Sequence, residues 1–455
     1  MLEFINTYIF GLAVPAALIA AGLFFSFRLK FFHILHPSVI FKTLSAKSDS
    51  DGMSPVRALS LALAGTLGVG NIVGVASAIY LGGVGSIFWM WVSAAAAMLL
   101  KYAETVLALR HRRADQNGEL HGGAMYYIKD AFSAWGLKKI GGAVAAVFAI
   151  LCIVNALSMG CVIQVNAVSR ALLGVCNVDT AFTGGVLAVL TVAVIVGGRE
   201  GISRLTERLV PFMTVAYVVM SVAVMIIRAD CVPDAFGAIF KDAFKADSAL
   251  GGVIGFALSR GVRYGTMRGL MSNEAGCGTA PIAHAGSSVR HAAQQGIWGI
   301  VEVFVDTIVL CTMTAVVIII SLGEVSVYGT DPIMMTLRAY SAVLGGWSEY
   351  VMAAMVLFFG FATVICWAHY GMECVSYLSV RSTWRSTWRR TWQWAFIAAY
   401  GVAVAVGAVT APEAVWGVAD MALGAMTIIN LAVICKMSGE VVRETREYIR
   451  AIKNR

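Results

Sequence analysis

Eleven apolar stretches of roughly membrane-spanning length run along this chain, separated by short polar connections. Of its 455 residues, 59% are hydrophobic and only 13% are charged, and the mean hydropathy is +0.79, which does not fit an ordinary water-soluble domain. Because a helix of about 20 apolar residues crosses a bilayer, the sequence predicts an all-α polytopic membrane protein with 11 transmembrane helices. The predicted spans are roughly residues 5–25, 55–80, 86–111, 140–173, 181–197, 205–228, 250–270, 293–322, 347–378, 394–409 and 412–437.

The basic residues are distributed unevenly over the connections between these spans. One alternating set, which includes Arg268, holds most of the Lys and Arg, whereas the other set holds only Arg228, Lys241, Lys245 and Arg338. Cytoplasmic connections carry the basic excess, so we expect a multi-pass protein of a bacterial cell (inner) membrane with its N-terminus outside and its C-terminus in the cytoplasm. The net charge of +8 then reflects topology and not nucleic-acid binding. The Trp and Arg residues of 384–392 are typical of an interfacial belt that faces anionic lipids.

The sequence contains no signature of catalysis. It has neither a Gly-x-Ser-x-Gly nucleophile motif nor a His-Glu-x-x-His zinc pair, so no enzyme and no organic cofactor are predicted. The nine cysteines form no Cys-x-x-Cys pair and mostly lie in apolar stretches, which favours buried small hydrophobes over disulfides. His284, His291 and His369 have no metal-binding spacing and are interpreted as polar fillers or interfacial residues.

The second span is interrupted by glycines at residues 65–71, Gly-Thr-Leu-Gly-Val-Gly-Asn. Glycine inside a helix costs about 1 kcal/mol relative to alanine, and an unpaired backbone group in hydrocarbon costs several kcal/mol more. A break at this depth persists only where it lines a buried site. We therefore expect the exposed backbone groups of this break to bind a charged solute.

A second group of glycines lies in the span at 250–270. This span holds Gly255, Gly261, Gly265 and Gly269 together with Arg260 and Arg263. With the first helix set aside, ten spans remain as two groups of five, each opened by a glycine-interrupted helix. Groups with an odd number of spans have opposite orientations, which predicts the inverted repeat of secondary transporters. The alternative is that these glycines only allow close helix packing.

The predicted organisation has four parts. They are an extra N-terminal helix with a cytoplasmic linker at 1–53, a first five-helix repeat at 54–230, a second at 231–437, and a basic cytoplasmic tail at 438–455.

Several motifs resemble the alanine or glycine:cation symporter family over most of the chain. They are residues 68–76, Gly85 with residues 88–91, residues 101–104, Arg268-Gly269 with the specific segment 272–281 (Ser-Asn-Glu-Ala-Gly-Cys-Gly-Thr-Ala-Pro), and Asp306-Thr307 with Cys311-Thr312. That family is similar in fold to the neurotransmitter:sodium symporters, with ten core helices in two inverted groups of five and one extra N-terminal helix. The resemblance thus implies the architecture that spans and glycines also predict.

The two ends of the broken helix suit different ions. The half-helix that starts near Gly68 presents free N–H groups and a positive dipole end, so the amides of Gly68, Val69 and Gly70 are expected to bind an amino-acid carboxylate. The half-helix that ends near Leu67 presents orphan carbonyls, so Ala64 and Leu67 are expected to bind Na⁺.

The resemblance implies further ligands. It implies that a hydroxyl of the ninth helix, here Thr363, completes the Na⁺ site, although Ala362 stands where the family often has Ser; the alternative for Thr363 is a hydrogen bond within its own helix. It also implies that Gln164 contacts the substrate, and Asn71 is given the same role. For both amides, interhelical hydrogen bonding is the alternative.

Trp367 lies four residues after Thr363, so the two side chains share a helix face. An indole at this place could cap a small pocket and exclude long side chains, while core packing is its alternative role. The amino group of the substrate is expected at carbonyls of residues 259–265, together with Gln164.

Charges inside the spans are costly and are usually paired or functional. Glu302 and Asp306 share a face of the eighth helix, and Arg260 and Arg263 are their candidate partners, with a structural bridge and a proton relay both open. Asn273 and Glu274, in the glycine-rich segment after the seventh helix, are expected to gate the inner mouth; a helix cap and turn is the alternative.

The leading hypothesis is a secondary active symporter that imports alanine or glycine with Na⁺ by alternating access, working as a monomer, with Na⁺ and substrate sharing the broken-helix centre. A H⁺-coupled transporter of the same fold is the first alternative. An amino-acid-permeable channel is the second, although no carbonyl filter or charged ring is present in the sequence.

Overall fold

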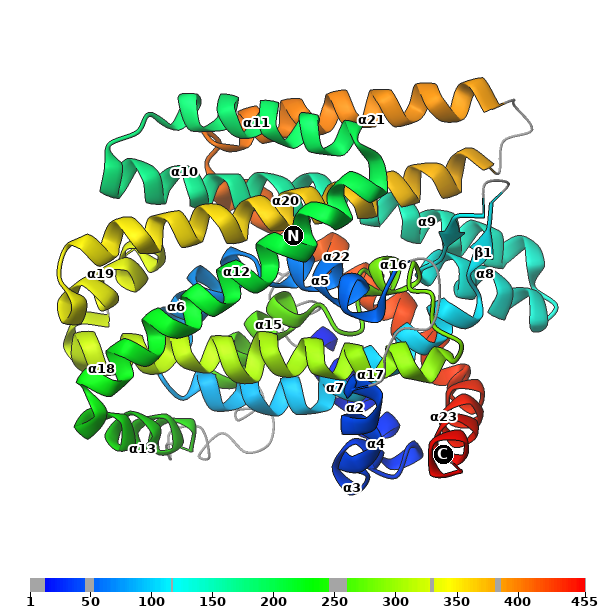
Figure 1. The fold of residues 1–455 in the computed structure, drawn as a ribbon, viewed down its shortest axis with the longest axis horizontal. Coiled ribbons are helices and arrows are strands. Elements are labelled where there is room, and N and C mark those ends of the chain that lie inside the picture. The colour runs from blue at the N-terminus through cyan, green and yellow to red at the C-terminus, as the bar shows by residue number, and fades with distance from the viewer. Residues whose placement is uncertain are drawn as a thin grey trace.

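A computed structural model describes residues 13–45, 53–115, 118–244, 260–327, 331–380 and 386–454 of the chain. It is a helical bundle in which most of the longest helices run along the long axis of the molecule (Figure 1). The helices before the two-stranded hairpin are α2 (Val14–Arg28), α3 (Phe32–Leu35), α4 (Pro37–Ser45), α5 (Pro55–Thr66), η2 (Val69–Asn71), α6 (Val73–Gly82) and α7 (Ser86–Arg110).

The remaining elements complete the bundle. The antiparallel strands β1 (Arg113–Ala114) and β2 (Leu120–His121) are followed by α8 (Ala124–Ala134), α9 (Lys138–Leu157), η3 (Ser158–Val162), α10 (Ile163–Cys176), α11 (Thr180–Val196), α12 (Gly198–Ile227), η4 (Ala229–Cys231) and α13 (Val232–Ala243). The second half contains α15 (Arg260–Asn273), α16 (Ala280–His284), α17 (Ala292–Val303), η6 (Phe304–Cys311), α18 (Thr312–Val327), α19 (Pro332–Leu344), α20 (Trp347–Val380), α21 (Ser386–Gly407), α22 (Pro412–Lys436) and α23 (Ser438–Lys453).

The structure confirms the predicted all-helical fold with several apolar helices of membrane-spanning length. Among the described residues, six helices are long and apolar enough to cross a membrane, and a seventh span is obtained when α5 and α6 are taken together. Shorter apolar helices lie at α2 and α11, and the first predicted span lies partly outside the described residues. The count of 11 spans and the inverted repeat therefore stay predictions.

The predicted break in the second span is confirmed. Helix α5 begins at Pro55, where the Ser54 hydroxyl accepts a hydrogen bond from the Arg57 amide, and it ends at Thr66. Gly68 has an extended backbone (φ −101°, ψ −162°), and one 3-10 turn, η2, leads into α6. The two half-helices meet at an angle of 63°.

The glycines of α15 have a different role from those at the break. A Cβ atom at Gly265 would lie 2.1 Å from the Ser86 carbonyl oxygen, and one at Gly269 would lie 2.4 Å from the Ser93 hydroxyl. These glycines therefore let α15 pack closely on α7, in agreement with the packing alternative. Gly255 and Ser259 lie outside the described residues.

The prediction of an unwound segment at 259–265 is wrong for its described part. Residues 260–265 belong to the regular helix α15, which continues to Asn273. The chain unwinds after this point, since Glu274 has a φ of 51° and Gly276 and Gly278 also have positive φ values. Glycine adopts this region without strain, whereas a residue such as Glu does so at a cost.

Two stretches of π-helix interrupt the long helices. One is η3, between α9 and α10, and the other is η6, between α17 and α18. Such wide turns are rare and often lie at functional sites. Here η3 ends two residues before Gln164, and η6 contains Asp306.

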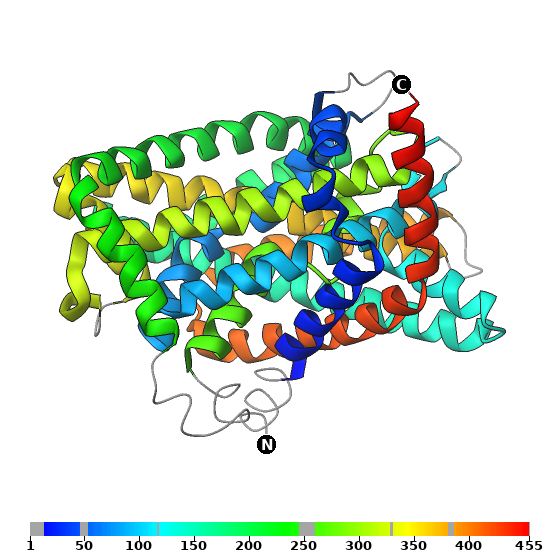
Figure 2. The ribbon, with the colours of Figure 1, turned by 90° about the horizontal axis from the view of Figure 1, so that it is seen from below.

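The two ends of the bundle are formed by different elements. Figure 1 shows α6, α18 and α19 at its left end, and α8, the β1–β2 hairpin and α23 at its right end. The C-terminal helix α23 packs against α7 and α17 along the right-hand end (Figure 2). The Arg110 side chain at the end of α7 pairs there with Glu440 and Glu444 of α23.

Candidate functional site

A cleft opens beside the break between α5 and α6. It holds about 780 Å³ of empty space, open solvent included. The residues that line it come from the broken span, from η3 and α10, and from α15, α19 and α22. They are Gly65, Thr66, Gly68, Val69, Gly70, Val73, Gly74, Ser77, Met159, Ile163, Gln164, Asn166, Ala167, Arg170, Arg268, Met271, Glu274, Ile333 and Trp416.

Gln164 bridges the break to the π-helical turn η3. Its Oε1 accepts a hydrogen bond from the Val69 amide at 3.0 Å, and its Nε2 donates to the Met159 carbonyl at 3.2 Å. Gln164, which was expected to contact the substrate, thus lies next to the break. The structure adds that the side chain already satisfies one of the amides that the break exposes.

Gly68 lies where an added side chain would force its neighbours to move. A Cβ atom at this position would lie 2.6 Å from Thr363 Oγ1 and 2.8 Å from Gln164 Oε1. Real Cβ atoms essentially never show contacts this short, so the side chain of Thr363 or Gln164 would have to shift. The absence of a side chain at Gly68 thus allows Thr363, Gln164 and the unwound backbone to converge.

The expected Na⁺ ligands Ala64 and Thr363 lie together beneath the break. Thr363 Oγ1 donates hydrogen bonds to the Ala64 carbonyl at 3.0 Å and to the Phe359 carbonyl of its own helix at 3.1 Å. The contact with Ala64 fits the interpretation of Thr363 as a Na⁺ ligand, and the contact with Phe359 fits the alternative of a hydrogen bond within its own helix. Leu67 is fully buried, and its amide donates to the Leu63 carbonyl at 2.7 Å.

Trp367 lies beneath the cleft and does not line it. Its indole packs against η3, where a Cβ atom at Gly160 would lie 2.2 Å from the ring. Its Nε1 donates to Glu274 Oε1 at 3.1 Å, while Glu274 Oε2 accepts from Thr279 at 2.7 Å. Glu274 itself lines the cleft, so Trp367 is connected to the cleft through this carboxylate.

Asn273 has the contacts of a helix end. Its Oδ1 accepts from the Ala275 amide at 3.0 Å, and its Nδ2 donates to Thr307 at 3.3 Å. These contacts correspond to the cap and turn, the alternative to a gating role.

The intramembrane charges are paired differently from the prediction. Arg260 and Arg263 were the candidate partners of Glu302 and Asp306, and this pairing is wrong for the described residues. Glu302 instead forms an ion pair with Lys101 at 3.3 Å and a hydrogen bond with His284 Nε2 at 2.8 Å. The sequence could not show this pairing, because Lys101 lies 201 residues before Glu302.

Two neighbouring interpretations change with this result. His284 is not an isolated polar filler, since its second ring nitrogen contacts the Gln295 amide at 2.9 Å. The Arg263 guanidinium lies over the Tyr264 ring, 5.4 Å from its centroid.

Asp306 contacts only neutral groups among the described residues. Its carboxylate accepts from Asn71 Nδ2, Ser272 Oγ and Thr307 Oγ1, each at 2.7 Å. Asn71 therefore does not point into the cleft, although it lies next to Gly70, which lines it.

Arg268 was missed as a cleft residue because the charge pattern assigned it to a cytoplasmic connection. It belongs to α15 and lines the cleft, with its guanidinium 4.8 Å from the centroid of the Trp416 ring. Arg170, at the same mouth, pairs with Asp331 at the start of α19. Only the crossing of α10, α15 and α22 in space brings these groups together.

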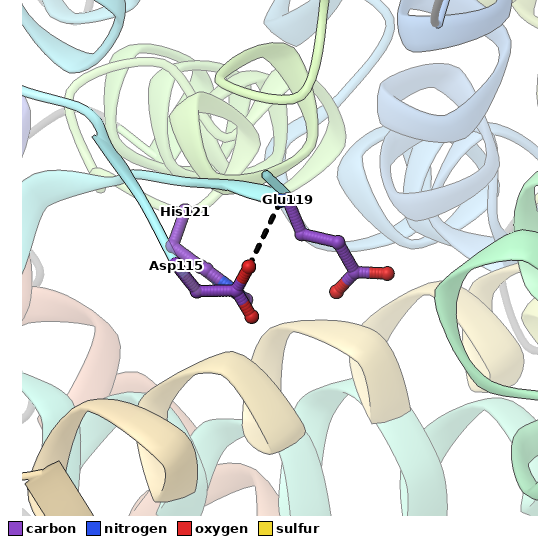
Figure 3. Close-up of side chains that lie close together, drawn as sticks. All are labelled: Asp115, Glu119 and His121. Carbon is purple, nitrogen blue, oxygen red and sulfur yellow. Dashed lines mark hydrogen bonds and ion pairs between the residues drawn. The ribbon is translucent and has the colours of Figure 1, made fainter. Parts of the chain in front are cut away.

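The hairpin brings together Asp115, Glu119 and His121, which are residue types that bind metals (Figure 3). Their ligand atoms lie within 4.8 Å of one another. However, His121 Nδ1 already contacts Glu373 of α20 at 2.8 Å, and this hydrogen bond raises the pKa of His121. Both ring nitrogens of His121 thus face carboxylates, Nε2 at 3.5 Å from Asp115 and Nδ1 at 2.8 Å from Glu373, and these contacts link the hairpin to α20.

Known proteins to which this chain is similar include symporters. The family described as the sodium:alanine symporter family matches residues 1–455. The chain is 37% identical to the sodium/alanine symporter AgcS of Methanococcus maripaludis, over 99% of this chain and 97% of that protein. It is 32% identical to a probable sodium/glutamine symporter, GlnT, of Bacillus subtilis, over 98% of this chain and 90% of that protein.

Among solved structures, the fold is similar to that of MhsT in complex with L-phenylalanine. The TM-score is 0.54 at 14% identity, over 85% of this chain and 89% of that chain. At this identity the likeness concerns the fold alone.

Proposed function

We infer the function of this protein from the premise that the chain belongs to the sodium:alanine symporter family. It is a membrane transporter and not an enzyme. We propose that it imports a small neutral amino acid, alanine or glycine, together with Na⁺ by alternating access. The observation that carries this proposal is the 63° break at residues 67–68, which opens directly on a cleft.

The carboxylate of the substrate is proposed to bind at the amides of residues 68–70, where η2 begins. A helix start carries a partial positive charge and suits an anion. Since Gln164 Oε1 accepts from the Val69 amide, the carboxylate competes with Gln164 for this donor. The displaced Gln164 side chain can then accept a hydrogen bond from the substrate amino group. Asn71 and Trp367 are proposed to hold the site in place through their hydrogen bonds to Asp306 and Glu274.

The Na⁺ ion is proposed to bind between Ala64 O, Leu67 O and Thr363 Oγ1. Hard cations hold oxygen ligands at about 2.3–2.6 Å, so two ligands of one ion lie about 3 Å or more apart. The 3.0 Å separation of Ala64 O and Thr363 Oγ1 fits this requirement. The ion and the substrate then bind on opposite sides of one break, so each raises the affinity for the other.

The cleft supports one direction of access. Its lining includes Val73, Gly74 and Ser77 of α6, Arg170 near the end of α10 and Ile333 at the start of α19. With the N-terminus outside and the C-terminus in the cytoplasm, as the basic residues indicate, this mouth faces outward. Asn273 and Glu274 are then proposed to gate the inward side of the site. The basic cytoplasmic connections are proposed to contact anionic lipids of the inner membrane.

Two broader features belong to the same proposal. We propose that residues 54–230 and 231–437 are inverted repeats behind an extra N-terminal helix, and that one monomer is the functional unit. Transport of D-alanine and of glutamine is part of the test, since relatives are named for different amino acids.

The test is uptake of radiolabelled alanine into proteoliposomes under an inward Na⁺ gradient. We expect accumulation with Na⁺, and about tenfold less with Gln164→Ala, because the variant loses the group proposed to accept a hydrogen bond from the charged substrate amino group, a loss of about 1–3 kcal/mol. Ser169→Ala is the matched control. Ser169 lies on α10, like Gln164, and the substitution removes its buried hydrogen bond to Ala408 O but no group that lines the cleft.

Three outcomes would contradict parts of this function. Uptake that ignores Na⁺ and follows a pH step would favour the H⁺-coupled alternative. Equilibration without accumulation would favour a channel. Normal uptake by Gln164→Ala would remove the assigned site.

A further inference from the structure

We propose that Asp115, Glu119 and His121 bind a divalent transition metal ion, with Zn²⁺ as the best fit, and that this ion fixes the β1–β2 hairpin to α20. None of these three residues lines the cleft. The site therefore goes beyond the proposed binding of an amino acid and Na⁺.

The backbone of the hairpin holds the three side chains together. The strand register pairs Arg113 with His121. The Asp115 amide donates to the Glu119 carbonyl at 2.9 Å, and the Glu119 amide donates to Asp115 Oδ1 at 2.9 Å. The possible ligand atoms of Asp115, Glu119 and His121 thus come within 4.8 Å of one another (Figure 3). Because backbone pairing already fixes these residues, little conformational freedom is lost when an ion binds.

His121 is oriented in the way that metal-binding histidines are. Its Nδ1 contacts Glu373 Oε2 at 2.8 Å, and a carboxylate at one ring nitrogen leaves the other nitrogen free to bind a metal. That second nitrogen, Nε2, is buried and has no hydrogen-bond partner among the described residues. It faces Asp115 Oδ2 at 3.5 Å. Two ligands of a tetrahedral zinc ion lie about 3.4 Å apart, since each bond is about 2.1 Å long, so an ion fits between these two atoms.

His111 shows how a simple ion pair looks in the same protein. Its imidazole also lies between two carboxylates, but both of its nitrogens form hydrogen bonds, Nδ1 with Asp130 at 3.1 Å and Nε2 with Glu440 at 3.4 Å. His111 therefore has no nitrogen left for an ion. His121 differs because its Nε2 faces Asp115 without forming a hydrogen bond.

A second imidazole with an unused nitrogen lies beside this cluster. His369 precedes Glu373 by one turn of α20, so the two side chains share a helix face. It is 2% exposed, and its Nε2 finds no hydrogen-bond partner in the described part of the chain. His369 is also close enough to His121 and Glu373 to interact with both electrostatically. Since buried polar atoms normally have a partner, two unpaired imidazole nitrogens at one place indicate a site for an ion and its bound water.

The charges around the cluster favour a divalent cation. Asp115, Glu119 and Glu373 contribute three carboxylates, and Arg199, which donates to the Leu120 carbonyl at 2.6 Å, contributes one guanidinium. The balance of these four groups is two negative charges, which one divalent ion neutralises. An imidazole nitrogen with carboxylate oxygens suits Zn²⁺, whereas Ca²⁺ and Mg²⁺ prefer oxygen ligands alone.

A metal ion at this place would act on the end of the bundle away from the cleft. Arg199 ties the hairpin to α12, and Arg112, directly before β1, donates to the Ala285 and Ser287 carbonyls after α16. The hairpin thus joins α12, α20 and the segment that follows α16. An ion that stiffens the hairpin favours the state in which these elements stay together, so we expect bound metal to slow transport.

The experiment measures ⁶⁵Zn²⁺ binding to the purified protein by equilibrium dialysis at about pH 8, because a proton competes with the metal for an imidazole. We expect one ion per wild-type protein. Binding should be about 100-fold weaker in His121→Gln and in a double variant, Asp115→Asn with Glu119→Gln, and about tenfold weaker in Glu373→Gln, which changes only the partner that orients His121. His111→Gln is the matched control and should bind like the wild type.

Two results would overturn the metal site. One is a wild type that binds no Zn²⁺, and the other is unchanged affinity in His121→Gln. If His121→Gln does not fold, the double variant gives the same test, because amides of the same shape replace its carboxylates.

Alanine uptake with Zn²⁺ on both sides of the membrane tests the effect on transport. We expect Zn²⁺ to slow uptake by the wild type and by His111→Gln severalfold, and to leave uptake by His121→Gln unchanged. Equal inhibition of His121→Gln and the wild type would overturn the link between this site and transport. Since Zn²⁺ binding is measured without alanine or a Na⁺ gradient, its failure would leave the proposed function standing, and Zn²⁺ binding without alanine uptake would contradict that function alone.

Discussion

The two halves of the broken span have opposite surroundings. Every residue of α5 from Ala58 to Thr66 is buried, and its start is tied to α12 by Arg57, which pairs with Glu200 and Glu207 at 2.9 and 3.4 Å. Helix α6, in contrast, presents Val73, Gly74 and Ser77 to the cleft.

This difference shows which part of the molecule would move. The cleft reaches the break from the α6 side, whereas packing and ion pairs close the α5 side. A transporter that exposes its site alternately to the two sides of a membrane must break the contacts around α5 and close those around α6. Removing ion pairs should therefore weaken the closed end around α5. Changing the size of side chains at the break should instead disturb the cleft beside α6.

The largest effect is expected for Gly68→Ala, which would fill the meeting point of the two halves. The added Cβ atom would lie 2.6 Å from Thr363 Oγ1, and overpacking of this kind costs about 1–3 kcal/mol. We expect Na⁺-driven alanine uptake to fall roughly 10- to 100-fold. Gly185→Ala in α11 is the control, since its Cβ atom would meet no atom within 4 Å. Equal uptake by both variants would show that the convergence at Gly68 is not needed.

Thr363→Val tests the ion on the α5 side of the break. Valine keeps the shape but removes the hydroxyl that contacts Ala64 O at 3.0 Å. We expect the Na⁺ concentration for half-maximal uptake to rise about tenfold, as the loss of one polar ligand costs about 1–2 kcal/mol. An unchanged Na⁺ dependence would leave Thr363 with only its hydrogen bond to Phe359 O.

Arg57→Ala tests the closed end. Loss of its two partly exposed ion pairs should favour opening by about fivefold, since such pairs contribute about 0.2–1 kcal/mol each and about 1 kcal/mol together. Cys366 reports on this opening because it is buried against α5, with its Sγ 3.0 Å from Leu61 O. We expect faster maleimide labelling of Cys366, measured by peptide mass spectrometry. Arg204→Ala removes an ion pair within α12 alone, so Cys366 of this variant should be labelled at the wild-type rate. Equal labelling rates in both variants would show that Arg57 does not help to hold this end closed.

The smallest effect concerns His111, at the end of α7. Burial lowers the pKa of His111, but hydrogen bonds to Asp130 and Glu440 raise it to about 9 overall. A raised pKa in the folded state stabilises the protein fully below about pH 6.5, and this stabilisation is lost as the pH rises through about 9.

We therefore expect the wild type to lose about 1 kcal/mol of stability between pH 7 and pH 10, after allowance for solvent screening, and His111→Gln to lose less. Thermal unfolding at both pH values measures this difference. Identical pH dependence of the two proteins would exclude His111 as the responsible group.

The sequence predicted the break well because Gly65, Gly68 and Gly70 weaken the helix at one point of an apolar span. Gln164 and Thr363, whose positions the resemblance carries, lie beside the break, and their roles in binding stay predictions. The prediction failed at α15, where Gly265 and Gly269 serve packing on α7. Glycine permits both a break and a close approach, so a glycine count alone does not separate the two.

Charge pairing was the other failure, and its cause is different. Arg260 and Arg263 lie near Glu302 and Asp306 in the linear sequence, whereas the actual partner of Glu302, Lys101, comes from α7. Arg268 likewise joins the cleft only because α15 crosses α22. Such pairs depend on helix crossings, which the pattern of a single sequence does not encode.

The central claim is that the break at residues 67–68 holds the amino acid and Na⁺. An experimental structure of the protein with alanine and Na⁺ tests it most directly. We expect the carboxylate at the amides of residues 68–70, Gln164 released from the Val69 amide, and an ion between Ala64 O and Thr363 Oγ1. Alanine bound away from the break, with the contact between Gln164 and Val69 intact, would contradict the account.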